Sequence, residues 1–178
     1  MTTSSLQHRF KILERQKQAT LAELHRYSPR ELQFNPAPSA WSMIQIAEHL
    51  QRTENAVLNG TFTQPGTRVQ TISQRTKASL MIALTLSPVR VGVPKATPVI
   101  APAEPLTLPE LEARWAATRS HLEVAIHEFP ADKARCNVFR HPVSGWMTLP
   151  QTLHFLSAHL THHGYQLRRV QRALQRAR

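Results

Sequence analysis

The chain has 178 residues, of which 41% are hydrophobic, and its 22 Lys and Arg against 11 Asp and Glu leave a formal charge of +11. A single cysteine, Cys136, excludes an internal disulfide framework and a cysteine-rich zinc module. The length suits one domain, and we expect residues 1–178 to form it. Because no run approaches the roughly 18 apolar residues of a membrane span and no secretory leader is recognisable, we expect a cytoplasmic protein without a membrane partner.

The basic charge, with a calculated pI near 11.2, is typical of nucleic-acid-binding proteins. Two features argue against nucleic acid as the main partner. Asp132 is the only aspartate and most cations are arginine, as in a composition biased across a whole proteome. Aromatic residues make up 6% of the chain and do not alternate with basic ones as stacking platforms for single strands do. A basic module that binds a polyanion therefore stays as the alternative hypothesis.

Apolar residues at helical spacing predict the first two helices and a long connection. The first helix covers residues 6–27, where a Ser-Pro step ends it. The second begins after Ser42, a predicted N-cap, and Gly60 is expected to terminate it. Residues 61–105 then form a connection far longer than neighbouring helices need, with a short helix over 73–84 followed by a Pro-rich passage.

Two further helices are predicted in the second half of the chain. One runs from Thr107 to Phe129 and the other from Thr148 to about Ala177, each with a threonine able to cap it and a proline in its first turn. The stretch 131–147 between them is expected to be irregular, because no alternating run is long enough for a sheet of several strands. The predicted fold class is all-α, a four-helix bundle with a long crossover between its second and third helices.

Three histidines fall on helix faces that such a bundle turns inward. His159 and His163 lie four residues apart, so their imidazoles share one face and can hold one metal ion. His49 lies within the apolar stripe of the second helix. Taken alone it is more simply a core histidine. Three neutral imidazoles buried together would need acceptors that these stripes lack, whereas one divalent ion satisfies all three.

Two blocks of the sequence resemble motifs of the DinB/YfiT-like superfamily of metal-dependent enzymes. Residues 41–50, WSMIQIAEHL, are similar to the signature of its second helix. Residues 141–167 are similar to its "HP…G…T" approach and HxxxHxxQ helix. The resemblance implies an up-down-down-up bundle in which His49, His159 and His163 hold one divalent metal. It also implies a homodimer and activities that include thiol-dependent S-transfer and maleylpyruvate isomerisation.

The ligand set favours catalysis independently of the resemblance. Three neutral histidines leave a divalent ion its full charge and an open position, as in catalytic zinc sites. Such an ion lowers the pKa of a bound water or thiol toward neutrality. We expect Zn or Ni first and Fe, Mn or Co as other candidates, with a low-molecular-weight thiol as a candidate cosubstrate. The predicted function is a metal-dependent transferase of the thiol S-transferase type or a hydrolase, and the further alternative is a metal-stabilised bundle without catalysis.

Glutamines near the three histidines are candidates for orienting the imidazoles. Gln45 lies four residues before His49, and Gln166 lies three residues after His163. The alternative is that both are solvated surface glutamines. Glu48 adjoins a ligand in sequence but points roughly 100° away on a helix, and we expect it only to flank the site.

Other side chains near the predicted site receive different assignments. Arg168 and Tyr165 are candidates for binding a small, anionic substrate. The alternative is that the C-terminal arginines meet the helix dipole and stay solvated. His162 is expected to flank the site, and Cys136 is expected to be an idle thiol. His141 and His154 are placed by default in loops or on the surface.

Overall fold

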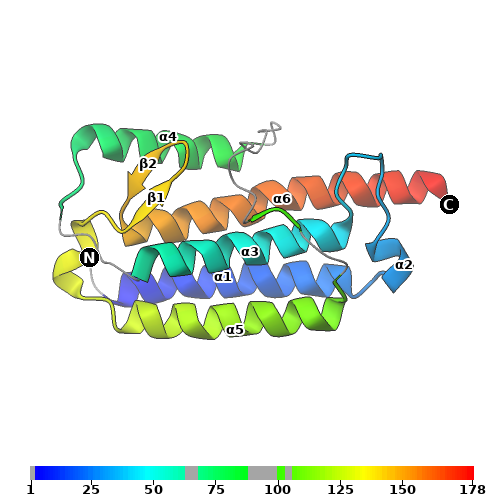
Figure 1. Ribbon diagram of the computed structural model, residues 1–178, viewed down its shortest axis with the longest axis horizontal. Helices are drawn as coiled ribbons and strands as arrows, with labels where there is room; N and C mark the ends of the chain where they lie inside the picture. The colour runs from blue at the N-terminus through cyan, green and yellow to red at the C-terminus, as the bar shows by residue number, and fades with distance from the viewer. Residues whose placement is uncertain (1–2, 63–67, 88–99, 103–105) are drawn as a thin grey trace.

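The computed structural model describes residues 3–62, 68–87, 100–102 and 106–178, and helices dominate it. The long helices are α1 (Thr3–Leu24), α3 (Met43–Phe62), α5 (Leu108–His127) and α6 (Leu149–Ala177). They lie side by side, and α4 (Ile72–Leu86) packs on the outer side of α6 (Figure 1). The predicted all-α class is therefore confirmed. None of the helices in the described ranges is both long enough and apolar enough to cross a bilayer.

Local side-chain signals set where the helices begin. Thr71, Thr107 and Thr148 each precede a helix, and each donates its backbone N–H to the Gln or Glu three residues later. These capping boxes satisfy N–H groups that a helix start leaves unpaired. Ser42 donates its backbone N–H to Gln45 in the same way, and its hydroxyl accepts from the Gln45 N–H at 3.4 Å. The predicted starts of α3, α5 and α6 are thus confirmed.

Two predicted helix ends differ from the structure. α1 ends at Leu24, and Ser28 then caps a separate short helix, α2 (Pro29–Leu32). α3 continues through Gly60, which lacks a positive φ and does not terminate the helix. A Cβ at this position would lie 3.7 Å from the Phe139 ring, an ordinary van der Waals contact, so the space around Gly60 does not require a glycine.

The crossover contains the predicted short helix, which is α4 and extends slightly beyond the predicted bounds. Of the Pro-rich passage predicted over residues 88–105, all but residues 100–102 lie outside the described part of the chain. The apolar residues of this passage run from Val91 to Ile100, and of these the structure describes only Ile100.

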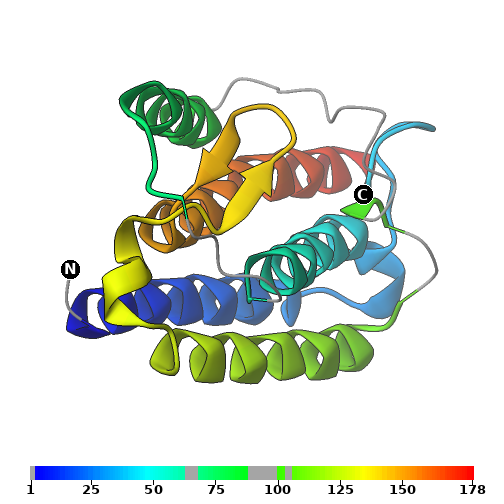
Figure 2. The same cartoon turned by 60° about the vertical axis from the view of Figure 1, so that its left-hand side comes forward.

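The stretch 131–147 holds structure that the sequence analysis did not predict. A 3₁₀ helix covers Ala131–Arg135, and β1 (Phe139–His141) pairs antiparallel with β2 (Gly145–Met147). Each strand has three residues, which is too short for alternation to show. Gly145 has a φ of 77°, a conformation that other residues rarely adopt, so the turn favours glycine. The hairpin stands beside α4 and above α6 (Figure 2).

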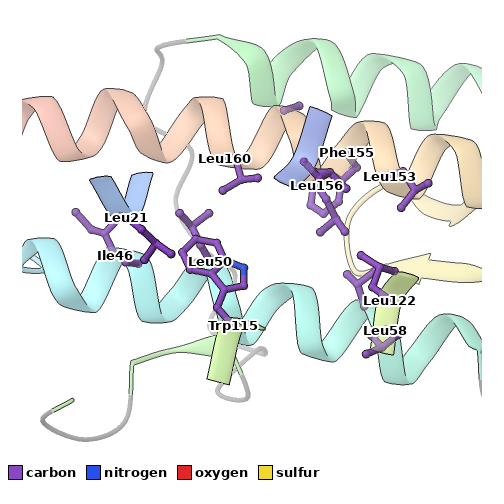
Figure 3. Close-up of a cluster of buried hydrophobic side chains, with 14 of the residues drawn as sticks. Leu21, Ile46, Leu50, Leu58, Trp115, Leu122, Leu153, Phe155, Leu156 and Leu160 are labelled. Atoms are coloured by element: carbon purple, nitrogen blue, oxygen red, sulfur yellow. The ribbon is translucent and has the colours of Figure 1, made fainter. Parts of the chain in front are cut away.

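Leucine and aromatic side chains fill the space between the four long helices (Figure 3). A buried ion pair joins α3 to α5 within this core. Glu54 accepts two hydrogen bonds from Arg119, at 2.6 and 2.9 Å, and one from the indole N–H of Trp115 at 2.6 Å. Glu54 and Arg119 are both only 2% exposed. Sequence patterning missed this pair, since isolated charges on a helix are normally solvated.

Candidate metal centre

Helix α3 supplies His49 and helix α6 supplies His159 and His163 to one cluster of imidazoles. The Nε2 atom of His159 lies 3.3 Å from Nε2 of His49 and 3.0 Å from Nε2 of His163. One nitrogen from each ring lies within 4.8 Å of the other two. The structure therefore brings together the three histidines that the sequence analysis singled out as metal ligands.

Hydrogen bonds on the far side of two rings determine where their protons lie. Nδ1 of His49 lies 2.7 Å from the carbonyl oxygen of Ile100, and Nδ1 of His163 lies 2.7 Å from Oε1 of Gln166. Both oxygens only accept, so each Nδ1 carries the ring proton and donates it. The Nε2 atoms of His49 and His163 therefore present lone pairs to the centre of the cluster.

Three nitrogens this close cannot satisfy one another. His159 alone has a proton to place at the centre, and a single N–H cannot bond well to two acceptors on either side of it. A cation among the three nitrogens would accept all three lone pairs at once. Zn²⁺, Ni²⁺ and related divalent ions all take imidazole ligands, so the donor set fits the metal that the sequence predicts.

Burial keeps the three imidazoles neutral. It lowers the pKa of His49, against the opposing effect of the hydrogen bond to Ile100. Burial, followed by repulsion from His163 and His49, lowers the pKa of His159 well below its ordinary value. Burial, followed by repulsion from His49, lowers the pKa of His163 to about 3. At neutral pH none of the three rings is an imidazolium, so a cation does not have to displace a second ring proton when it binds.

The metal-free protein should lose stability as the pH falls below about 6.5. The unfolded chain then binds protons at histidines with ordinary pKa values near 6.5, while folded His163 stays neutral down to about 3. Stability is therefore complete above the unfolded value and declines through this window, by about 1.4 kcal/mol per pH unit for such a histidine. Urea unfolding at pH values of about 7.5, 6.5 and 5.5 measures the slope. A slope unchanged in His163→Leu would contradict this assignment.

Comparison with known protein families matches residues 12–167 to the DinB superfamily. The chain belongs to the DinB superfamily. The matched range contains all three clustered histidines, and it confirms the family resemblance inferred from the two sequence blocks. Searches among curated proteins and among solved structures found no match.

Aromatic rings surround the cluster of this DinB-superfamily chain. The ring centroids of Trp41 and His49 lie 5.0 Å apart. The Phe155 ring stacks on His159, with centroids 5.6 Å apart and an interplanar angle of 23°. His162 is buried beside His163, and its Nδ1 lies 3.1 Å from the Ser87 carbonyl. These neighbours shield the rings from water, which strengthens any electrostatic interaction at the centre.

Gln45 differs from its predicted place in the DinB-superfamily site. Its Oε1 accepts from the backbone N–H of Ser42 at 2.9 Å and from Asn35 at 3.1 Å, so it caps α3 instead of orienting His49. The carbonyl of Ile100 takes the predicted role. A main-chain group 51 residues away leaves no signal in the local sequence, and reasoning from helix faces could not identify it.

Gln166 accepts from His163 and, by holding that ring, should raise the affinity for metal. We expect Gln166→Ala to weaken Zn²⁺ binding roughly 10- to 100-fold, as loss of such partners typically does. Gln166→Glu keeps an acceptor and should retain most of the affinity. Calorimetric titration of tag-free protein measures the change, with Gln171→Ala on the same helix as control. Equal affinities in Gln166→Ala and wild type would refute the orienting role.

Two adjacent arginines lie on α6 beyond His163, and the sequence analysis singled out one of them, Arg168. Arg168 is exposed, and its guanidinium lies 4.8 Å over the ring of Tyr165, in a cation–π contact. Arg169, which the sequence analysis did not single out, is the arginine whose charge acts on His163 and adds to the effects of burial and His49 on its pKa. His141, expected outside the site, likewise adds to the electrostatic repulsion on His159.

Proposed function

We propose that this protein is a divalent-metal-dependent enzyme whose three-histidine centre serves thiol S-transfer or hydrolysis. The observation that carries the proposal is the convergence of the Nε2 atoms of three neutral imidazoles, those of His49, His159 and His163. Three neutral ligands are typical of catalytic rather than structural zinc sites. When bound, a divalent ion supplies a Lewis acid that lowers the pKa of a coordinated water or thiol. We expect Zn or Ni, with Fe, Mn or Co as further candidates.

The chain's own residues prepare the centre for this chemistry. Ile100 and Gln166 hold the imidazoles of His49 and His163 in one tautomer. The ring of Trp41 packs beside His49, and the ring of Phe155 stacks on His159. The charge of Arg169 acts on the site and favours a small, anionic substrate. Arg168, stacked on Tyr165 further along α6, is proposed as a second contact for such a substrate.

Several properties of the whole molecule complete the proposal. They are a single domain over residues 1–178, up-down-down-up order in the bundle, a cytoplasmic location and a homodimer. Light scattering of the purified protein tests the last of these, since a monomer mass would refute it.

Activity assays on tag-free protein test the reaction class. The protein is assayed as loaded with Zn²⁺ or Ni²⁺, after chelation and after reloading, with small thiols plus an electrophile and separately with esters and amides. We expect turnover that chelation abolishes and reloading restores. Turnover that is independent of metal would refute the proposal. Metal binding that raises the melting temperature without any turnover would favour a metal-stabilised bundle instead.

A further inference from the structure

We propose that His141 is a hydrogen-bond donor that holds an oxygen of the substrate beside the three-histidine centre. This inference rests on the proposed function, because it places a ligand at that centre. It adds a residue on the β-hairpin to a site otherwise built from helices. Its ligand class is a carboxylate or a carbonyl group, whose oxygen atoms accept hydrogen bonds.

The hairpin turn holds His141 in one tautomer. Its Nδ1 accepts hydrogen bonds from the backbone N–H groups of Val143 and Ser144, each at 3.2 Å. Because backbone N–H groups only donate, Nδ1 must present a lone pair, and the ring proton lies on Nε2. This tautomer is the reverse of that in His49 and His163, whose Nε2 atoms carry lone pairs. Nε2 of His141 is thus a donor.

His141 contacts the same aromatic ring as His159 without belonging to the group of three clustered histidines. The ring centroids of His141 and Phe155 lie 4.7 Å apart, and the Phe155 ring also stacks on His159. Burial lowers the pKa of His159 most, followed by repulsion from His163, His49 and His162. Repulsion from His141 lowers it further. The three nitrogens that lie within 4.8 Å of one another belong to His49, His159 and His163, and none belongs to His141. The Phe155 ring thus lies against both His141 and His159, and a ligand that extends from the centre past this ring would meet Nε2 of His141.

The Nε2–H group of His141 is available to such a ligand. Among the described residues, no acceptor bonds to it. Burial lowers the pKa of His141 to about 4, so the imidazole stays neutral at pH 7 and keeps this single proton. A neutral donor next to an electrophilic centre can hold a substrate oxygen without adding a positive charge that would repel the metal ion.

The competing explanation is that His141 serves only to close the hairpin turn through Nδ1. The two roles use different ring atoms, so conservative variants can separate them. In His141→Asn, the side-chain oxygen lies near the position of Nδ1 and can still accept from Val143 and Ser144, but the distal donor is lost. In His141→Gln, the amide N–H₂ lies near the position of Nε2, so the donor is kept.

The test uses full-length, tag-free protein loaded with Co²⁺, whose visible absorption spectrum reports both metal binding and acetate binding. We expect His141→Asn to bind Co²⁺ as the wild type does and to raise the acetate Kd roughly tenfold or more, as loss of a hydrogen bond to a charged group predicts. His141→Gln should recover part of that affinity. The control is His121→Asn, an exposed position on α5, which lies on the opposite side of the molecule from the hairpin (Figure 1).

Each other outcome decides against a stated claim. An unchanged acetate Kd in His141→Asn overturns the donor role. A Co²⁺ affinity that falls as far in His141→Asn as in His159→Ala also overturns it, because His141 would then be a ligand. Failure of the wild type to bind Co²⁺ refutes the proposed function itself. If neither His141 variant folds, long-range ¹H–¹⁵N correlation spectra of the wild type decide, since a proton on Nδ1, or an Nε2–H signal unmoved by acetate, overturns the donor role.

Discussion

Replacing His159 with alanine should lower the affinity for Zn²⁺ by more than the roughly 100-fold that loss of a supporting partner costs, because His159 is a direct ligand. Its Nε2 lies between the Nε2 atoms of His49 and His163, at 3.3 and 3.0 Å, and its loss removes the middle of the donor set. Two imidazoles that no longer converge on a third cannot complete a tetrahedral site. Calorimetric titration of tag-free protein measures the effect.

The matched control is His154→Ala, on the same helix and exposed. It should bind one equivalent of Zn²⁺ with the affinity of the wild type. Circular dichroism of metal-free His159→Ala shows whether α6 still folds. Wild-type affinity in folded His159→Ala protein would show that the metal binds elsewhere.

Replacing Arg119 with methionine should destabilise the protein by about 3–5 kcal/mol, the usual cost of leaving one partner of a buried pair without the other. Glu54 would stay in the core with only the indole of Trp115 donating to it. Burial raises the pKa of Glu54, while the attraction of Arg119 opposes this rise, so the variant would protonate Glu54 in the folded state. Urea unfolding measures the loss.

The double variant Glu54→Leu/Arg119→Met should recover only part of that loss. Apolar replacement of a whole buried pair is often neutral, but here the buried indole N–H of Trp115 loses its acceptor. The exposed pair of Arg26 and Glu23 on α1 and its following turn provides the comparison, and Arg26→Ala should cost less than about 1 kcal/mol. If Arg119→Met costs no more than Arg26→Ala, the buried network does not stabilise the bundle as described.

The sequence predicted those features whose cause is local. A threonine followed by proline and then Glu or Gln marks the starts of α5 and α6, since capping depends on neighbours within one turn. His159 and His163 could be paired from their spacing, and His49 from its place in an apolar stripe. Each of these inferences needs only helix geometry and the chemistry of the side chain.

Features that depend on segments distant in sequence could not be predicted. The Ile100 carbonyl that orients His49 belongs to the main chain of the crossover, so no residue type reveals it. Glu54 and Arg119 are charged residues whose burial follows only from the packing of α3 on α5. His141 looks like a loop histidine until the hairpin gives its Nδ1 two donors and places its ring against Phe155.

The central claim is that three histidines from α3 and α6 form one metal site. An anomalous-difference map from crystals of tag-free protein grown with Zn²⁺, measured on both sides of the zinc absorption edge, tests it most directly. We predict one strong peak per chain, bonded to the Nε2 atoms of His49, His159 and His163. A map with no peak there, or with its strongest peak at other side chains, would contradict the account.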